Sequence, residues 1–418
     1  MTRCWPRSIG GIALAACAGA CVILPSAALA QVTPAGPITP TGTLTPLLGA
    51  GGRLFALDVI GRVDYDSNVA RGRAVLAGVK GLHKDDILYQ PSASVNLDWP
   101  VGRQALFLSG HVGYDFHQYN ETLNAGRINL AGGGLARLGP CSGTGTLGYA
   151  LSQSDQAFLP LQVTKDIQTV ESAGVQLRCG SGHLGGFLGA QDISATNSAS
   201  SLVDSSTVSV NGGLFYQNTA LGQVSLFSSY SSTDYDSNND PTLPSVPGFR
   251  SYSTGVSIAR PIGARLKGSA AVSYQTAKSR DGTGTSFSGL GAQGSLEYRV
   301  TPRLRALLLF SRQVEPTIQP GSNFTVVQFV QLDGTYRVSS RISAGLGASW
   351  NNVDYRGGVQ LPTFVNNDRI RAIYGNASMR LGRRASLALD VRREVRNTNL
   401  TLFDYTDYRV GVTATRSF

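Results

Sequence analysis

Tight-turn sequences recur along this chain at intervals of roughly 38 to 44 residues, and this spacing restricts the fold more than any other feature. Each interval contains two alternating runs of roughly 11 to 14 residues and one longer polar loop. A membrane-spanning β-strand needs about 9–11 residues, so each interval predicts one antiparallel hairpin with its long loop at the far end. The turns are Pro100-Val101-Gly102, Gly139-Pro140-Cys141, Gly180-Ser181-Gly182, Ala220-Leu221-Gly222, Pro261-Ile262-Gly263, Thr301-Pro302, Ser339-Ser340 and Arg383-Arg384.

The end of the chain alternates with a period of two, which is the period of a β-strand. One face would carry Tyr408, Val410, Val412, Ala414, Arg416 and Phe418, and the other Arg409, Gly411, Thr413, Thr415 and Ser417. A final strand that ends on an aromatic residue resembles the last strand of bacterial outer-membrane barrels. Arg416 departs from that pattern, because an apolar or aromatic residue is usual two places before the end.

Counting strands gives one before the first turn, two in each of seven intervals and three after the last turn, which makes eighteen. Sixteen would follow if the hairpin around Ser194 to Asn218 were misread. The sequence therefore predicts an all-β fold, a transmembrane antiparallel up-and-down β-barrel with its termini and short turns on the periplasmic side. A barrel of this size encloses water, whereas an eight-stranded barrel is filled by side chains.

The chain begins with a predicted signal peptide, residues 1–30. Arg3 and Arg7 precede an apolar stretch that ends in the cleavage sequence Ala28-Leu29-Ala30, although Leu14-Ala15-Ala16-Cys17 also resembles a lipoprotein processing box. Residues 31–52, with repeated Thr-Pro and Gly, predict a flexible periplasmic tail, and residues 53–418 the barrel. Cys141 and Cys179 remain after cleavage, and they could form a disulfide or stay two free thiols.

The composition agrees with a membrane barrel better than with a soluble protein. The chain has 50 glycines, 15% charged residues and a mean hydropathy near zero. An apolar lipid face and a polar lumen average to such a value because they alternate residue by residue. A soluble β-sandwich or solenoid would share the alternation, but it would not explain the terminal Phe418.

Charged residues are sorted between the two predicted ends of the barrel. Acidic residues collect at the outer strand ends, at Asp64, Asp66, Asp115, Asp155, Asp192, Asp234, Asp236, Glu315 and Asp354. Arginines lie beside the tight turns and predict a basic periplasmic mouth, formed by Arg103, Arg137, Arg178, Arg260, Arg265, Arg299, Arg303, Arg337, Arg341, Arg380, Arg383 and Arg384. This mouth could anchor the barrel to lipid phosphates, or it could attract anionic solutes, since guanidinium groups bind carboxylates and phosphates in a two-point fork.

One predicted strand carries a mixed charge ladder on its lumen face. Asp390, Arg392, Glu394 and Arg396 alternate there with the lipid-facing Leu387, Leu389, Val391 and Val395. We expect Arg369 and Arg371 of the neighbouring strand to share a face and to join this ladder. The ladder could impose a field across the lumen, in which case Arg392→Glu or Arg396→Glu should change the ion selectivity. The charges could equally neutralise one another and only order the wall.

The sequence offers little for catalysis or for a metal site. His111, Asp115 and His117 share a predicted strand face, but six strand residues span about 20 Å, so both histidines cannot ligate one ion. A hydrolase built on these residues is the least favoured function. The pentapeptide Asp64-Tyr65-Asp66-Ser67-Asn68 recurs at Asp234-Tyr235-Asp236-Ser237-Asn238, with a looser echo at Asn352-Val353-Asp354-Tyr355. Its oxygens could bind a cation, although turn formation beneath an interfacial tyrosine is the commoner role.

The first predicted strand, Leu57-Asp58-Val59-Ile60-Gly61-Arg62-Val63-Asp64-Tyr65-Asp66-Ser67-Asn68-Val69, resembles the opening of the putative β-barrel porin 2 family. Members of this family similarly have a signal peptide, one barrel that fills the chain and a C-terminal Phe. Some lie with exopolysaccharide synthesis genes. The resemblance implies an outer-membrane barrel and a role in export or assembly of surface polysaccharide, and no catalytic residue comes with it.

Together these features predict a water-filled channel in the bacterial outer membrane, with no cofactor, that passes a hydrophilic and anionic solute. Export of an anionic exopolysaccharide, aided by periplasmic export proteins, is the most specific form of this hypothesis. The alternatives are a general small-solute porin and an adhesion barrel that binds ligands through long loops such as Ser67–Lys84 and Ser237–Arg250. We expect contacts with outer-membrane lipid and lipopolysaccharide, recognition of the strand ending at Phe418 by the barrel assembly machinery, and no nucleic-acid partner.

Overall fold

The computed structural model describes residues 54–418, apart from 160, 162, 200–201, 220, 237–246, 263–264, 281, 283–285, 320 and 358–364. The predicted signal peptide and periplasmic tail, residues 1–30 and 31–52, lie outside the described residues. Eighteen strands form one sheet, in which each strand pairs antiparallel with its neighbours in sequence.

Every strand is long enough to cross a membrane. The strands are β1 (Phe55–Asp66), β2 (Asp86–Val101), β3 (Gln104–His117), β4 (Ala125–Leu138), β5 (Cys141–Gln153), β6 (Ile167–Ser181), β7 (Leu184–Asn197), β8 (Asp204–Asn218), β9 (Gly222–Asp236), β10 (Phe249–Ile262), β11 (Leu266–Ser279), β12 (Phe287–Arg299), β13 (Leu304–Glu315), β14 (Phe324–Arg337), β15 (Ile342–Arg356), β16 (Asn367–Arg380), β17 (Ala385–Thr398) and β18 (Tyr405–Ser417). In the described parts of the loops lie three short helices: α1 (Ala74–Val79), η1 (Glu121–Leu123) and η2 (Thr401–Phe403).

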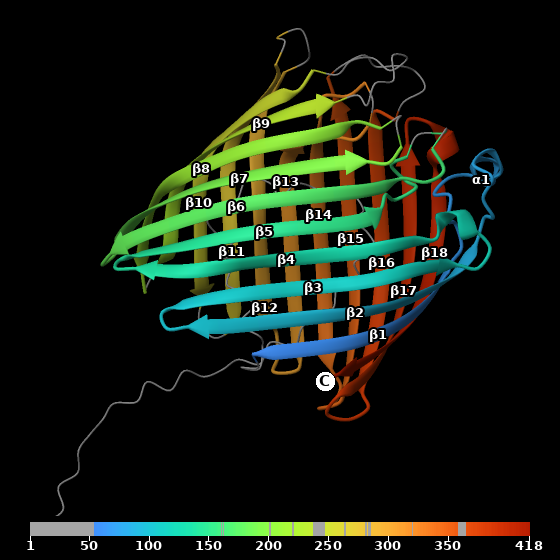
Figure 1. The fold of residues 1–418 in the computed structure, drawn as a ribbon, viewed down its shortest axis with the longest axis horizontal. Helices are drawn as coiled ribbons and strands as arrows, with labels where there is room; N and C mark the ends of the chain where they lie inside the picture. The colour runs from blue at the N-terminus through green and yellow to red at the C-terminus, as the bar shows by residue number, and fades with distance from the viewer. Residues whose placement is uncertain are drawn as a thin grey trace, which may run out of the picture.

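The sheet closes on itself, because β18 pairs with β1 over nine positions from Asp58↔Ser417 to Asp66↔Arg409. The prediction of a closed antiparallel barrel with eighteen strands is therefore confirmed (Figure 1). The partition of the strands was wrong in detail. Two strands precede the first turn, where one was predicted, and two follow the last turn, where three were predicted. The two early strands are β1 and β2, which are separated by a loop with a helix, residues 67–85.

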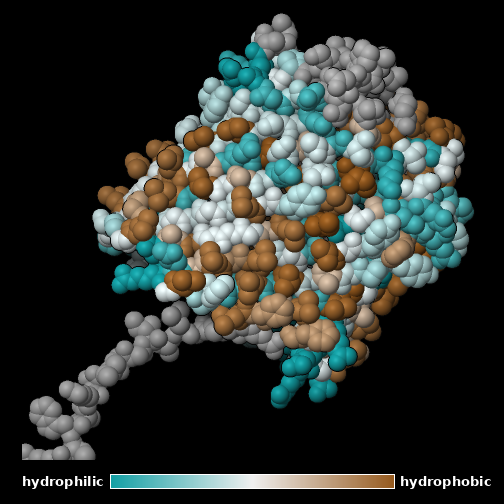
Figure 2. All heavy atoms as spheres, in the orientation of Figure 1, coloured by the Kyte–Doolittle hydropathy of each residue, from teal (hydrophilic) through white to brown (hydrophobic). Residues whose placement is uncertain are grey.

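Side chains alternate between the lumen and the outside along each strand, as a period of two requires. The outward side chains are mostly apolar and exposed: Leu346 is 68% exposed and Ile373 is 58% exposed. Figure 2 shows such apolar side chains spread over the strands in front, with hydrophilic ones gathered toward the ends. None of the described helices is long and apolar enough to cross a membrane.

The wall is interrupted between β12 and β13. Their pairing stops at Ala292↔Arg312, so the outer end of each strand lacks this neighbour. Beyond that point Val314 of β13 and Phe324 of β14 pack against Phe249 of β10 and Phe287 of β12. Phe249 and Phe287 lie on the lumen side of their strands, so the tip of the β13–β14 hairpin bends into the lumen. The Arg312 side chain spans the gap and donates a hydrogen bond to the Leu290 carbonyl at 2.6 Å.

Cys141 and Cys179 form a disulfide with an S–S distance of 2.04 Å. They are directly paired residues of β5 and β6, next to the short turns. Of the two alternatives left open by the sequence, the structure has the disulfide.

Candidate functional site: the lumen and its two mouths

The short turns join the strands at one end of the barrel, and the arginines predicted for a basic mouth gather there. Arg137, Arg178, Arg299, Arg337 and Arg380 lie on the lumen side of their strands. Turn residues supply six more: Arg103, Arg265, Arg303, Arg341, Arg383 and Arg384. Among the described residues, Arg299 is the one member of the predicted set in an ion pair, with Glu297 at 3.6 Å.

Arg260 is placed differently from the other members of this set. It pairs with Gly268 and shares the outer face of β10 with the exposed Val256 and Ile258. It therefore belongs to the outer face of the wall near the short turns and not to the lumen, because its position on β10 has the parity of the outward residues.

Three arginines border a recess of about 500 Å³ at the mouth formed by the short turns, which is the predicted periplasmic one. Arg341 lies in the turn after β14, and Arg380 and Arg383 lie at the turn after β16, with Ser340 and Gly382 completing the lining. The Arg380 backbone N–H donates to the Arg341 carbonyl at 2.9 Å and so holds the two turns side by side. No described carboxylate pairs with these three guanidinium groups. The recess can therefore receive an anion.

Arg178 extends this basic surface into the lumen. Its guanidinium stacks on the Phe215 ring, 3.8 Å from the centroid, and donates to the Gln223 Oε1 at 2.7 Å. Phe215 belongs to a buried cluster with Phe187 and Phe227, which also lie on the lumen side of the wall. The stacking fixes the direction of a cation that has no described acidic partner.

The predicted ladder on β17 lies in the lumen, as expected, but it is neutralised. Arg396 is 1% exposed and forms a two-point pair with Asp368, at 2.6 Å and 2.9 Å. Arg392 pairs with Glu394 at 2.6 Å. Asp390 accepts hydrogen bonds from Arg62 at 2.9 Å. These contacts agree with the hypothesis that the charges neutralise one another better than with the hypothesis that they impose a field across the lumen.

Arg369 and Arg371 do not join the ladder, which corrects the prediction. The register of β16 and β17 places Ile370 opposite Arg396, so the residues beside the ladder are the even-numbered ones of β16. Arg369 and Arg371 pair with Asn397 and Val395 on the outer face. A shift of one residue in the register would have reversed this outcome, and a single strand sequence does not fix the register.

The loop between β1 and β2 folds into the mouth at the other end of the barrel, the predicted outer mouth, and is anchored there by Arg71. This side chain, 7% exposed, donates to Asp66 at 2.5 Å and to Asp407 at 2.7 Å, and it lies 3.7 Å from Asp155 of the β5–β6 loop. The three carboxylates raise the pKa of the Arg71 guanidinium far above its usual value, against the opposing effect of burial. Arg409 adds a second guanidinium to the same cluster, 2.7 Å from Asp407.

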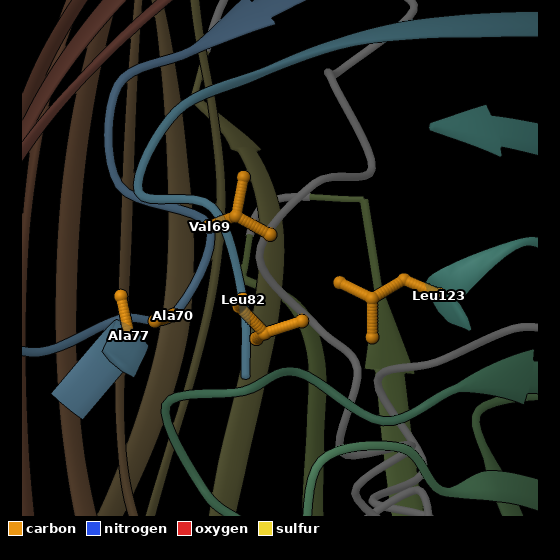
Figure 3. Packing of buried hydrophobic residues seen from close by; sticks show 5 residues of the cluster. All are labelled: Val69, Ala70, Ala77, Leu82 and Leu123. Carbon is orange, nitrogen blue, oxygen red and sulfur yellow. The ribbon is translucent and has the colours of Figure 1, made fainter. Parts of the chain in front are cut away.

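Apolar contacts join loops from opposite sides of the barrel. Val69, Ala70, Ala77 and Leu82 of the first loop pack with Leu123 of the β3–β4 loop (Figure 3). Leu76 of α1 packs against Val353, Tyr355, Val365 and Phe403. Leu159, Val163, Leu202 and Ile318 bring together the loops after β5, β7 and β13. These contacts narrow the outer mouth with a packed cluster, which we call the loop plug: residues 67–85, 154–166, 198–203, 316–323 and 399–404, as far as they are described.

The loop plug also contains a buried lysine. Lys80 is 5% exposed, and its ammonium donates to the Gln156 Oε1 at 3.0 Å across two loops. Burial lowers the pKa of Lys80 to about 8, because desolvation opposes the charged form more than the nearby Asp155 favours it, and Arg396 opposes it further. The long loop Ser67–Lys84, proposed as an adhesive segment, is thus largely committed to contacts within the barrel. The other proposed segment, Ser237–Arg250, lies mostly outside the described residues.

The histidines and the repeated pentapeptide make structural contacts. His117 Nδ1 lies 3.0 Å from Asp86, and Asp115 lies 2.9 Å from the Arg127 Nε. His111 and His117 remain on one face of β3, but they are not brought together. Asp66 of the first pentapeptide binds Arg71, and Asp234 of the second forms an ion pair with Arg280. Within the described residues, no group of three His, Cys, Asp or Glu side chains could hold a metal ion.

Sequence reasoning missed the partners that assemble this cluster. Asp407 and Arg409 lie on the last strand and meet Asp66 and Arg71 at the start of the chain. The acid at Asp66 was noted, but as a strand end. The opposite charges two residues apart at Asp407 and Arg409, on one face of the strand, were the available signal. The sequence does not state which side chains they meet.

A family model described as "Putative beta-barrel porin 2" matches residues 229–418. The chain is an outer-membrane porin-like β-barrel. The predicted resemblance to this family is thereby confirmed over the matched residues, although the strand that suggested it lies before them. This similarity and the closed barrel together imply the bacterial outer membrane. No curated protein matches the chain.

Several solved porins are similar to this porin-like barrel in structure. Pseudomonas aeruginosa OccK2 (OpdF), also solved in complex with glucuronate, aligns with a TM-score of 0.47 and 10% identity over 87% of this chain and 97% of its own. Acinetobacter baumannii OccAB3 aligns with a TM-score of 0.46 and 10% identity over 87% and 99%. P. aeruginosa OccK11 (OpdR) reaches 13% identity with a TM-score of 0.45 over 87% and 96%. These values are too low to transfer a solute from those proteins to this chain.

Proposed function

We propose that this porin-like barrel is a channel for hydrophilic anionic solutes that approach from the periplasmic side. The observation that carries the proposal is the basic periplasmic mouth, where Arg341, Arg380 and Arg383 border a recess without a paired carboxylate. Unpaired like charges at an entrance raise the local concentration of counter-ions and bias which ions enter. The ladder on β17 does not support this preference, since its arginines are paired.

The most specific form of the proposal is passage of an acidic exopolysaccharide. A chain of uronate or phosphate groups would meet a series of guanidinium groups, each able to form a two-point contact. Arg178, held flat on Phe215, would be the next contact inside the mouth. Because the loop plug narrows the other end, we propose a gated conduit whose opening displaces the first loop, and not a permanently open pore.

Planar-bilayer recording tests the proposal, with the reversal potential measured under a salt gradient. We expect anion preference in the wild type and its loss or reversal when Arg341, Arg380 and Arg383 are together changed to Glu. Arg260→Glu is the matched control, because it changes the charge at the same end of the barrel but on the outer face. An unchanged reversal potential in the triple variant would contradict the proposal.

Block by added polymer separates the polysaccharide conduit from a general small-solute porin. An acidic polysaccharide should reduce the current from the turn side at lower concentration than a neutral polysaccharide of the same size. Equal block by both polymers would favour a general porin. If the wild type is silent, the variant Arg71→Gln, which releases the first loop, should conduct; silence in both would contradict a channel.

A further inference from the structure

Three arginines project from the lipid-facing side of the barrel near its outer end. Arg369 and Arg371 lie two residues apart on β16, which corresponds to about 7 Å along a strand. Arg393 of β17 pairs with Ile373 and is therefore diagonal to Arg371. All three are exposed, and they form one basic patch on the outer face.

The patch lacks compensation by acids. No described carboxylate lies within ion-pair distance of the three guanidinium groups. Asp354, diagonal to Arg369 on the same face, is the nearest acid in the register, and it accepts hydrogen bonds from Asn367 at 2.6 Å and Asn352 at 3.5 Å. Like charges next to one another on a sheet destabilise it, and an anionic partner would remove this repulsion.

Neighbouring side chains place the patch at the level of the outer membrane–water interface. Trp350 is paired with Arg371 and Tyr408 with Arg393, and such aromatic residues mark the interface in barrels. The Arg393 guanidinium lies 5.9 Å from the Tyr408 ring centroid. Toward the membrane interior the same face continues with the exposed apolar Ile373 and Leu346. Arginine in hydrocarbon is costly, whereas at the interface it can reach headgroups.

We infer that Arg369, Arg371 and Arg393 form a binding site for the phosphorylated headgroup of an outer-leaflet glycolipid. The guanidinium groups would hold phosphate oxygens in two-point contacts, and the acyl chains would lie along Ile373 and Leu346. This site is separate from the basic mouth, since it lies at the other end of the barrel and on the other side of its wall. If the glycolipid site is refuted, the proposed channel function is unaffected.

Trp350 provides an intrinsic reporter for the test. The only other tryptophan of residues 54–418 is Trp99, at the opposite end of the barrel, and Trp5 lies in the predicted signal peptide. Protein with Trp99→Phe, purified in detergent, is titrated with lipid A that carries two phosphates, and the Trp350 emission is recorded. We expect a saturable change whose dissociation constant becomes at least about tenfold weaker in the triple variant Arg369→Gln, Arg371→Gln and Arg393→Gln.

Three controls make the result decisive. Arg260→Gln removes an exposed outer-face arginine at the periplasmic end, and it should leave the titration unchanged. The same glycolipid without phosphates should not produce the saturable change, and inorganic phosphate alone should not reproduce it. The inference is overturned if the triple variant binds as tightly as the parent, if the phosphate-free glycolipid binds equally, or if inorganic phosphate gives the same response, which would indicate a simple anion site.

Discussion

Protonation of Lys80 should control how tightly the first loop is held in the outer mouth. Its side chain is buried beneath the β5–β6 loop, and burial lowers its pKa from 10.5 to about 8, with Asp155 opposing the shift and Arg396 adding to it. When the loop leaves the lumen the lysine regains water, and its pKa returns to the usual value. The open loop therefore binds this proton more tightly than the docked loop does.

The sign and size of the effect follow from linkage. Below pH 8 the lysine is charged in both states, so the full burial penalty opposes docking. As the pH rises above 8, the docked form loses its proton first, and docking becomes more favourable until about pH 10.5. Between pH 7 and pH 9 the equilibrium constant for opening should fall about tenfold, which is about 1.4 kcal/mol.

Hydrogen exchange of the amides in residues 67–85 measures this opening. The protection factor is the exchange rate of an unstructured peptide divided by the measured rate at the same pH. For these amides it should rise about tenfold from pH 7 to pH 9. Lys80→Met should remove the dependence on pH, because no titrating group remains at that position. Lys84→Met is the matched control, since Lys84 is exposed in the same loop. Protection that stays constant in the wild type, or that rises equally in Lys80→Met, would refute the reasoning.

Three further predictions concern the contacts that hold the barrel and its plug. Arg71→Gln breaks the pairs with Asp66 and Asp407 and leaves Arg409 as the remaining described guanidinium beside these buried carboxylates, so docking of the first loop should weaken by about 2–3 kcal/mol, seen as lost protection of residues 67–85. Arg396→Met should lower the free energy of unfolding by about 3–5 kcal/mol in denaturant titrations, because Asp368 stays buried, whereas Arg396→Met with Asp368→Leu should recover most of it; equal losses in both would contradict the assignment. Cys141→Ser with Cys179→Ser should cost about 2–4 kcal/mol in the same assay under oxidising conditions, with no loss expected once the wild type is reduced.

The loops show why the outer mouth was harder to predict than the wall. Residues 67–85 mix glycines and charged residues with apolar ones such as Val69, Leu76 and Leu82, and their length and position between two strands suggested an adhesive segment. The structure docks them through Leu76 onto Val353 and Tyr355, residues that are far away in the chain. Such contacts depend on closure of the barrel, since only closure brings β15 and β1 to one rim.

The sequence by itself determined the wall: its strand number, the ends at which the turns and loops lie, and the alternation of Leu387 and Leu389 with Asp390 and Arg392. These are local properties, because the period of a strand and the chemistry of a turn are written in adjacent residues. The tertiary structure decided which charges meet. Arg369 and Arg371 face the lipid, Asp407 meets Arg71, and the ladder is neutralised, because the register between strands sets which residues are opposed, and a shift of one residue exchanges lumen and lipid.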